Sequence, residues 1–398
     1  MVEPSFEEIL AGHKLFIDKN ALSPHYVPME WNYRDNETRT LMSAVAPAIS
    51  GQKPKNLFLY GKTGSGKSIT TRRVLVKLAE QKSEFVVTSY MNCRVYDSRY
   101  KVIQKVIGEF DAEFAKTGHA FSVLYEKLLD WLETGKKQLI LVLDEVDVVK
   151  DLDPLIYTLT RANDELKSGN VSMIGISNKI NFKQKLETRS KSSLCEEEVV
   201  FQPYNSEQLG GILTQRVPIA FNKNVVDQSA LGLAAAIAAG ENGDARYALN
   251  LLLRAGERAE KEKKETVTDR DVESARKDAD TDKAREIIEG LPEHQQLVLY
   301  SLAVISEDLT YTRLIEDTKG ERVYLSGEVL ERYESMCRKM GKEARSARWY
   351  REYLRELENL GLIISSHSSK GFRGQGTFLR LTYPAEKVKK AVESNLQN

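Results

Sequence analysis

Residues 61–68, GKTGSGKS, have the types and spacing to bind a phosphate chain. They fit the pattern GxxxxGK[ST], in which glycines let the backbone curl so that its N–H groups converge on phosphate oxygens. Lys67 would place a positive charge on the β- and γ-phosphates, and Ser68 would offer a hydroxyl to Mg²⁺. The sequence therefore predicts an ATP or ADP site, with Mg²⁺, whose loop residues are Gly61, Lys62, Thr63, Gly64, Ser65, Gly66, Lys67 and Ser68.

The context of this loop supports the prediction. An apolar strand pattern, residues 56–60, precedes the loop, and a helical pattern, residues 67–80, follows it. The positive N-terminal end of that helix would point at the bound anion. The alternative is a glycine-rich turn with no ligand.

Two acids, Asp144 and Glu145, close a second apolar strand pattern, residues 138–147. The carboxyl end of a buried parallel strand lies at the ligand-binding edge of such a sheet. Asp144 would hold Mg²⁺ and Glu145 would polarise the attacking water. The alternative is that both acids cap the helix that follows.

Strand and helix patterns alternate through the first half of the chain, with further strands expected at 85–91, 171–178 and 197–204. Such alternation predicts an α/β fold with a parallel sheet covered by helices on both faces. One crossover is unusually long, because two helical patterns fall within 98–134 where one would suffice. We interpret these helices as an insertion that carries function.

From Ser206 onward the patterns are helical, and a highly charged stretch without apolar periodicity ends near residue 280. Beyond it we expect helices at 285–289, 293–305, 310–317, 325–341 and 344–360, followed by two strands around a glycine-rich turn. Helices followed by such a hairpin are typical of a winged helix-turn-helix. The expected domains are a nucleotide-binding core (1–205), a helical lid (206–280) and a winged-helix domain (281–398).

Composition restricts the class of protein. The chain has 398 residues with 58 basic and 58 acidic side chains, so any basic surface must be local. Three widely spaced cysteines give neither a disulfide framework nor a zinc site. The N-terminus has no apolar signal core and no apolar run approaches membrane-spanning length, so we expect a cytoplasmic protein without a membrane partner.

The order of these features resembles the AAA+ ATPases, and within them the initiator family of the largest eukaryotic origin-recognition subunit and cell-division-control protein six, especially its archaeal members. The segments YVPMEWNYRDNE, NCRVYDSRY, GISN, SKSSL and GDARYALNLLLRA carry the resemblance, which spans residues 5–385. It implies that Asn178 contacts the γ-phosphate or the attacking water, and that Arg246 reaches the γ-phosphate from the lid. The alternative for Asn178 is an ordinary turn residue at the end of a strand, and the alternative for Arg246 is a solvated arginine on a helix.

The resemblance assigns further residues to the nucleotide site. Arg189 is similar to the arginine finger that a subunit offers to its neighbour, where it stabilises transition-state charge. The nearby Lys191 is the alternative. Adenine would lie against the N-terminal segment, at Tyr26, Val27, Pro28 and Arg34. For Tyr26 and Pro28 a purely structural role is the alternative.

A local excess of positive charge falls near the C-terminus. Between Met336 and Arg380 there are ten Lys and Arg residues and four acids, which indicates a surface for nucleic-acid phosphates. In the pattern from Ala344 to Leu360, one stripe is apolar and faces the core, while another is cationic and would enter the major groove of DNA. The apolar stripe is Tyr350, Tyr353, Leu354, Leu357 and Leu360. The cationic stripe is Arg345, Arg348, Arg351 and Arg355.

The glycine-rich turn adds Lys370 and Arg373, which would reach the minor groove or the phosphates. In the family this helix and wing bind origin DNA, and the inserted helices near 98–134 resemble its second DNA contact. Candidate contacts there are Arg99, Lys101 and Lys105, which could equally be plain surface charges.

The predicted function is an ATP-dependent replication initiator with slow ATP hydrolysis, whose nucleotide state would switch recruitment of the replicative helicase. Further initiator subunits on the DNA are implied partners. One alternative is a signalling ATPase of the STAND type, in which the winged helix serves self-assembly. A second is a DNA-binding protein that holds ADP permanently.

Overall fold

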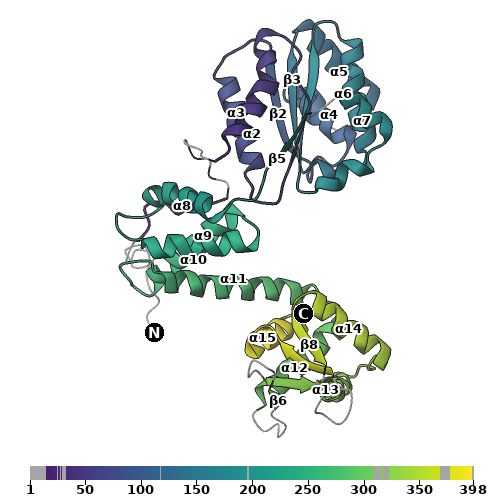
Figure 1. Cartoon of the computed structure of the whole chain (residues 1–398). Coiled ribbons are helices and arrows are strands. Elements are labelled where there is room, and N and C mark those ends of the chain that lie inside the picture. Colours follow the sequence, from purple (N-terminus) through teal and green to yellow (C-terminus); the bar gives the residue numbers. More distant parts are fainter. Residues whose placement is uncertain are drawn as a thin grey trace. The chain divides into compact units, whose positions relative to one another are not determined.

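The computed structural model describes residues 15–24, 26, 28, 33–116, 118–194, 197–308, 315–316, 322–367 and 377–396. The chain divides into two compact units, Met1–Glu273 and Ser274–Asn398. The first unit contains a parallel sheet and most of a helical lid, and the second contains helices around a small antiparallel sheet (Figure 1).

The sheet of the first unit has five parallel strands in the order β2-β3-β4-β1-β5. Each strand lies close to where the sequence predicts one, and the predicted α/β class is confirmed. Strand order and crossovers put the ends of β1, β3 and β4 side by side, which brings the phosphate loop next to the acids after β3. The strands are β1 (Leu57–Tyr60), β2 (Val86–Asn92), β3 (Gln138–Asp144), β4 (Asn170–Ser177) and β5 (Glu197–Val200).

Strand β3 shows why this sheet needs helices on both faces. Alternate side chains of a strand point to opposite faces. Leu139, Leu141 and Leu143 enter one apolar core, while Ile140 and Val142 enter the other, and all five are fully buried. A strand buried on both sides is apolar on both faces, as β3 is at every position between Gln138 and Asp144.

Helices α2 and α3 cover one face of the sheet, and α4 to α7 cover the other (Figure 1). The pair α4 and α5 forms the expected insertion between β2 and β3. The helices are α2 (Asp35–Val45), α3 (Lys67–Ala79), α4 (Arg99–Gly108), α5 (Phe121–Thr134), α6 (Leu152–Glu165) and α7 (Thr188–Leu194). Short 3₁₀ helices are η1 (Lys19–Leu22), η2 (Ala46–Ser50), η3 (Ala112–Ala115), η4 (Val146–Val148) and η5 (Ile180–Lys185).

The helical lid follows with α8 (Ser206–Ala220), α9 (Gln228–Glu241) and α10 (Ala245–Lys261). Helix α8 begins at a capping box in which Asn205 and Gln208 exchange side-chain to backbone hydrogen bonds. Helix α10 begins at Asp244, whose carboxylate accepts from the backbone N–H groups of Arg246 and Tyr247. The cap of α10 therefore fixes where Arg246 projects.

Helix α11 (Asp269–Glu289) corrects the expectation of a break near residue 280. The charged stretch is one continuous 21-residue helix, and the separate helix expected at 285–289 is its last turn. Arg276 and Asp280, and Arg285 and Glu289, form ion pairs four residues apart, a spacing that supports a helix without an apolar stripe.

The second unit is built around α12 (Glu293–Glu307), which contacts α13 (Ser326–Lys339), α14 (Ala347–Asn359) and α15 (Ala385–Leu396). Its antiparallel sheet has the order β6-β7-β9-β8. These elements match the predicted winged helix. The strands are β6 (Ile315–Glu316), β7 (Arg322–Leu325), β8 (Ile363–His367) and β9 (Thr377–Leu381).

Three features of this unit differ from the prediction. Ile315 and Glu316, expected in a helix at 310–317, form strand β6. The other residues of that range lie outside the described part of the chain. Strand β7 and helix α15 were not predicted. Helix α15 forms because Val388, Ala391 and Val392 recur at helical spacing and are buried against the core. Among the described residues, no helix is long and apolar enough to cross a membrane.

Candidate functional site

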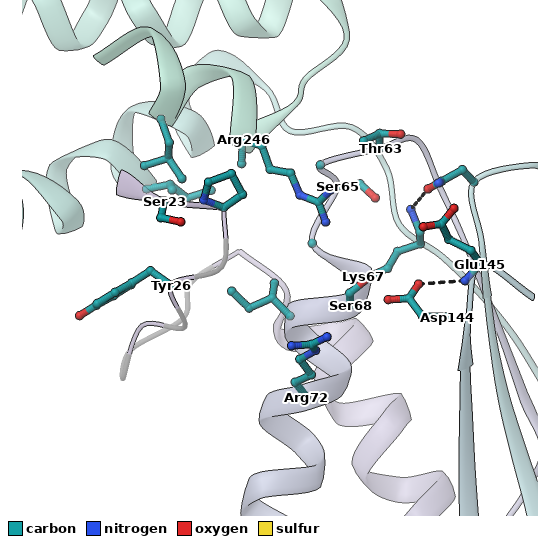
Figure 2. A pocket seen from close by; sticks show the side chains of 18 of the residues that line it. Ser23, Tyr26, Thr63, Ser65, Lys67, Ser68, Arg72, Asp144, Glu145 and Arg246 are labelled. Atoms are coloured by element: carbon teal, nitrogen blue, oxygen red, sulfur yellow. Dashed lines mark hydrogen bonds between the residues drawn. The ribbon is translucent and has the colours of Figure 1, made fainter. Parts of the chain in front are cut away.

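The phosphate loop adopts the curled backbone that its glycines permit. Gly61, Gly64 and Gly66 have φ values of 155°, 71° and 99°, which residues with a Cβ rarely adopt. Lys67 begins helix α3 directly after Gly66. The loop lines one wall of a cavity of about 300 Å³ (Figure 2). Gly61 and Lys62 are not among its lining residues, whereas Thr63 to Ser68 are.

The amine of Lys67 is buried and donates to three oxygens. It lies 2.7 Å from the carbonyl oxygen of Gly61, 2.9 Å from that of Lys62 and 2.8 Å from Oδ1 of Asn178. Burial lowers the pKa of Lys67 from 10.5 to about 8, and the positive charge of Arg246 adds to the decrease while Asp144 opposes it. The cation is thus held at the closed end of the loop by neutral acceptors.

Asp144 and Glu145 lie opposite the loop, as their places at the end of β3 predict (Figure 2). The hydroxyl of Tyr90, on the neighbouring strand β2, donates to Oδ2 of Asp144. Burial, followed by the charge of Asp144, raises the pKa of Tyr90 to about 12, so this hydroxyl keeps its proton at physiological pH. Asp144 is therefore fixed in direction by a donor that the motif alone does not reveal.

Glu145 has a left-handed backbone, with φ of 57°, an uncommon conformation for a residue with a side chain. Its two carboxylate oxygens are both engaged. Nδ2 of Asn92 lies 3.2 Å from one, and Nε of Arg94 lies 2.5 Å from the other. Both partners come from the end of β2, so the general-base candidate is held by the loop that leads into the inserted helices.

Asn178 follows β4 and completes this side of the cavity. Its neighbours are anchored by Asp147, whose oxygens accept from the hydroxyl of Ser177 at 2.8 Å and the amine of Lys179 at 2.9 Å. Burial raises the pKa of Asp147, but the hydrogen bonds from Lys179 and Ser177 lower it more. The pKa of Asp147 therefore lies below its usual value. The turn that carries Asn178 is therefore clamped on both sides.

The lid and the N-terminal segment close the opposite side. Arg246 and Leu249 of α10, Ile212 and Arg216 of α8, and Ser23, Pro24 and Tyr26 all line the cavity. Arg216 is buried; it lies 4.5 Å below the ring of Tyr26 and donates to the carbonyl oxygens of Ala21 and Tyr26. Tyr26 is thus supported from below at the mouth of the cavity.

The lid also touches the phosphate loop directly. The backbone N–H of Ala245 lies 3.3 Å from the carbonyl oxygen of Gly64, and the amine of Lys62 lies 3.3 Å from Oδ1 of Asn242. A Cβ on Gly64 would come within 1.7 Å of a carboxylate oxygen of Asp244. Gly64 is therefore needed for close approach of the lid as well as for the turn.

Two predicted adenine contacts are placed elsewhere. Arg34 is 4% exposed and does not line the cavity; it donates to the carbonyl oxygens of Ser65 and Gln202 and lies 4.0 Å above the ring of Tyr204. It braces the phosphate loop from behind. Pro28 is not among the lining residues, and Val27 lies outside the described part of the chain.

Arg189 lies on α7 and is exposed, whereas the adjacent Ser190 is buried. It does not line the cavity of its own chain. The alternative, Lys191, is directed back to the carbonyl oxygen of Gln184 at 3.3 Å. Arg189 is the more exposed of the two cations on this face.

Sequence reasoning missed several residues of the site. Arg72 lines the cavity and its guanidinium stacks 4.4 Å from the ring of Tyr90. It follows Ser68 by four residues, a spacing that puts both on one face of α3 and could have revealed it. Asn92, Arg94 and Arg216 carry no comparable local signal, because their roles arise from contacts between distant segments.

Helix α14 begins at Ala347 and not at residue 344 as expected, so Arg345 lies just before the helix, while Arg348, Arg351 and Arg355 lie on it. Arg345, Arg348, Arg351 and Arg355 are all exposed, while Tyr350, Leu354 and Leu357 are buried. Leu360, expected in the core, is 44% exposed because α14 ends at Asn359. Arg355 is paired with Glu352, one turn away. Lys370 and Arg373 lie outside the described residues.

The candidate cations of the inserted helices have partners on the neighbouring helix α5 or directly beside α4. Arg99 lies 4.1 Å from the ring of Phe121, Lys101 pairs with Asp97 at 2.7 Å, and Lys105 pairs with Glu109 at 3.2 Å. Such local pairs are typical of a solvated helix surface, and they give these residues no distinguishing mark as DNA contacts.

The residues present fit a nucleotide with Mg²⁺. Ser65 has a buried hydroxyl with no hydrogen-bond partner among the described residues, and it lies in the curled loop. Lys67, Arg72 and Arg246 supply positive charge, and the hydroxyl of Ser68 with the carboxylate of Asp144 supplies the oxygen ligands that Mg²⁺ prefers.

Comparison with known proteins covers nearly the whole chain. Family models match three segments: an AAA domain at residues 50–181, a Cdc6 AAA+ ATPase-type lid domain at 211–277 and a CDC6 C-terminal winged helix domain at 286–391. The ORC1-type DNA replication protein of Thermococcus onnurineus is 37% identical over 393 residues, which cover 96% of this chain and 92% of the relative. ORC1-type DNA replication protein 1 of Methanosarcina mazei is 34% identical over 391 residues, covering 97% and 92%.

Solved structures give the same result. The Aeropyrum pernix ORC1 protein, solved in complex with DNA, superposes with a TM-score of 0.70 at 36% identity and covers 96% of this chain and 97% of its own. Cdc6p from Pyrobaculum aerophilum has a TM-score of 0.60 at 19% identity, covering 96% and 99%, and shares the fold.

Proposed function

Because the chain belongs to the family of ORC1-type DNA replication proteins, we propose that it is an ATP-dependent replication initiator that binds double-stranded origin DNA. The observation that carries the proposal is the presence, on one chain, of the nucleotide cavity and of the exposed arginines of α14. We propose that residues 1–205 form the AAA+ core, 206–280 the lid and 281–398 the winged helix, with α11 running across the second boundary.

The first unit would bind ATP or ADP with its phosphates on the loop 61–68. Lys67 and Arg246 would neutralise phosphate charge from the core and the lid, and Tyr26 would flank the base. Ser68 and Asp144 would hold Mg²⁺, which when bound neutralises charge that builds up on the transferred phosphoryl group. The lining of the cavity by all five of these residues supports this assignment.

Hydrolysis would use three side chains in distinct roles. Glu145 would accept a proton from the attacking water, and Asn178 would orient that water or the γ-phosphate. Arg189, exposed on α7, would act on the nucleotide of a neighbouring subunit. Because Glu145 is engaged by Asn92 and Arg94, we expect slow turnover, as suits a switch rather than a motor.

The second unit would bind the duplex through α14 in the major groove, with Lys370 and Arg373 of the wing at the backbone. An arginine stripe on a helix exposed to solvent suits a polyanion. It favours DNA binding over the alternative of a STAND-type ATPase, whose self-assembly arm has no need of such a stripe. We further propose that the nucleotide state controls recruitment of the replicative helicase and of further initiator subunits, and that the protein acts in the cytoplasm at the nucleoid.

Footprinting on genomic DNA with ATP, with ADP and with a Lys67→Ala variant tests the proposal. We expect protection of discrete duplex sites and a footprint that differs between ATP and ADP. In the variant, the protection should be lost at a lower salt concentration. A Glu145→Gln variant should retain the ATP footprint and lose turnover; unchanged turnover would favour permanent ADP binding. Absence of salt-sensitive duplex binding by the nucleotide-loaded protein would exclude the initiator function.

A further inference from the structure

Trp349 is a large aromatic side chain on the surface that the arginines of α14 also occupy. It is the third residue of α14 and is 56% exposed. Burying a tryptophan stabilises a fold or a complex more than burying almost any other side chain, so its exposure on a helix with a well-formed core face is informative. The other face of α14 buries Tyr350, Leu354 and Leu357, so α14 packs normally without Trp349.

Trp349 is the outermost of a series of neighbouring aromatic rings. Its indole lies 6.2 Å from the ring of Tyr353, one turn along α14, and Tyr353 lies 6.5 Å from the ring of His294 with an interplanar angle of 8°. Nδ1 of His294 lies 2.8 Å from the hydroxyl of the fully buried Tyr333. The exposed indole is thus connected ring by ring to the core of the unit.

Hydrogen bonds at the inner end of this series join His294 to the segment that precedes α14. The hydroxyl of Tyr333 accepts from the backbone N–H of Arg345 at 3.1 Å and shares a hydrogen bond with Nδ1 of His294. Burial, followed by the charge of Arg345, lowers the pKa of His294, which keeps the imidazole neutral at physiological pH. A supported ring loses little conformational freedom on binding, which favours a role in recognition.

The charges around Trp349 indicate the chemistry of its partner. Within the described part of the second unit, no carboxylate is paired with the guanidinium group of Arg345 or Arg348. Arg348 immediately precedes Trp349 in α14, and Arg345 lies in the segment just before the helix. A polyanion that also presents an apolar group between its phosphates satisfies both features.

Double-stranded DNA presents such a group in the major groove. Residues at the N-terminal end of a recognition helix reach the base edges, and Trp349 lies in the first turn of α14. In a stacked duplex the faces of the bases are covered, so an aromatic ring meets their edges. The apolar group on these edges is the 5-methyl group of thymine.

We propose that Trp349 recognises the 5-methyl group of thymine in the major groove, and so contributes a preference for thymine-containing duplexes that the arginines cannot supply. This inference rests on the proposed function, because it requires that α14 enter the major groove. Arg345 and Arg348 set the affinity for phosphates, and Trp349 adds discrimination between bases.

Replacement of thymine by uracil tests the inference, since it removes this methyl group and leaves base pairing unchanged. The full-length protein with ATP would be titrated with a short alternating adenine–thymine duplex and with the corresponding adenine–uracil duplex, by fluorescence anisotropy. We expect binding to the uracil duplex to be about fourfold weaker, the factor expected for one methyl group no longer buried. Trp349→Ala should bind both duplexes equally, and Trp349→Phe should retain part of the difference.

Three controls make the result specific. Met340→Ala, which removes another exposed apolar side chain of the same unit, should keep the fourfold difference. Arg348→Ala should bind both duplexes more weakly and keep their ratio. Thermal denaturation should show that Trp349→Ala unfolds at the temperature of the native protein, because the indole is exposed.

Three outcomes would overturn the inference in different ways. If Trp349→Ala and the native protein show the same ratio between the duplexes, Trp349 does not recognise the methyl group. If Trp349→Ala binds both duplexes more weakly and the native protein does not distinguish them, the indole stacks on an unpaired base or packs on the sugar. If the native protein shows no salt-sensitive binding to either duplex, the proposed function fails and this inference fails with it.

Discussion

The amine of Lys67 donates a hydrogen bond of 2.8 Å to the side-chain oxygen of Asn178, which joins the phosphate loop to the end of β4. Because the amide oxygen accepts this bond, the amide nitrogen of Asn178 is directed elsewhere with two N–H donors. One side chain thus fixes the cation of the site and presents donors to the cavity that it lines. We therefore expect Lys67 to act mainly on nucleotide binding and Asn178 mainly on hydrolysis.

Replacing Asn178 by alanine should slow ATP hydrolysis by about 10²-fold, the usual loss when one donor to a reacting group is removed. ADP affinity should change by less than about threefold, since Lys67 keeps its two backbone acceptors and its charge. Single-turnover hydrolysis and calorimetric ADP titration measure the two quantities. An equal loss in both would show that Asn178 acts only by holding Lys67.

Nucleotide affinity should depend on pH through Lys67. Its pKa in the free site is about 8, and a bound phosphate raises this pKa because it favours the charged amine. Binding therefore takes up protons around and above pH 8, and affinity should fall as pH rises through 8, by at most about tenfold per pH unit. Affinity should be nearly constant below pH 7.

Calorimetry of ADP binding in two buffers with different ionisation enthalpies would measure this proton uptake. A Lys67→Arg variant is the matched control, because a guanidinium stays protonated over this range. Proton uptake that persists unchanged in Lys67→Arg would assign the effect to another group.

Arg94 should restrain hydrolysis. Its guanidinium engages one carboxylate oxygen of Glu145, and the arginine itself is largely exposed. Arg94→Ala leaves that oxygen to the weaker donor Asn92 and to water, so Glu145 can turn toward the attacking water more often. We expect basal turnover to rise about two- to fivefold, the effect of releasing an exposed ion pair of up to about 1 kcal/mol.

The control for Arg94→Ala is Lys101→Ala, which breaks the nearby ion pair with Asp97 and leaves Glu145 untouched. Its turnover should equal that of the native protein. Slower turnover in Arg94→Ala would mean that the arginine supports Glu145 in its active position instead of restraining it.

Much of the site was predictable because its residues lie in contiguous patterns. The loop 61–68 and the acids Asp144 and Glu145 each follow a buried strand, and parallel strands bring their carboxyl ends to one edge of the sheet. Arg34 was misplaced for the opposite reason. Its place in the sequence suggested the base, whereas its hydrogen bonds to Ser65 and Gln202 depend on packing between segments far apart in the chain.

The second unit shows a similar division. The two faces of α14 follow from its spacing, so its buried and exposed residues were predicted apart from Leu360 at its end and Tyr353, which is only partly buried. Helix α11 was interpreted as a break because it lacks an apolar stripe, but its lysines, arginines, glutamates and alanines favour a helix through intrinsic propensity and ion pairs. Strand β6, only two residues long, forms by pairing with β7, and no local pattern encodes that pairing.

Asp147 should position Asn178 without contacting the nucleotide. Asp147→Ala removes the acceptor of Ser177 and Lys179, which lie on either side of Asn178. We expect the free energy of unfolding to fall by about 1–3 kcal/mol, the cost of leaving a buried polar partner unsatisfied. We also expect hydrolysis to slow less than in Asn178→Ala.

Asp147→Asn is the informative companion, because its amide oxygen can still accept from Ser177 while the ion pair with Lys179 is lost. It should recover most of the hydrolysis rate, with KM for ATP close to the native value. A loss of ATP affinity in place of turnover would contradict a positioning role for Asp147.

The arginines of α14 should contribute unequally to DNA binding. No carboxylate is paired with Arg348 among the described residues, whereas Arg355 is paired with Glu352. Arg348→Ala should therefore reduce the slope of log affinity against log salt by about 0.9, the value for one lost phosphate contact. Arg355→Ala should reduce it less, because DNA must compete with Glu352 for that guanidinium.

Lys390→Ala on α15, an exposed cation paired with Glu386, is the charge-matched control. Salt titrations of duplex binding give all three slopes, and equal slopes for the Arg348 and Lys390 variants would show that α14 does not face the phosphates.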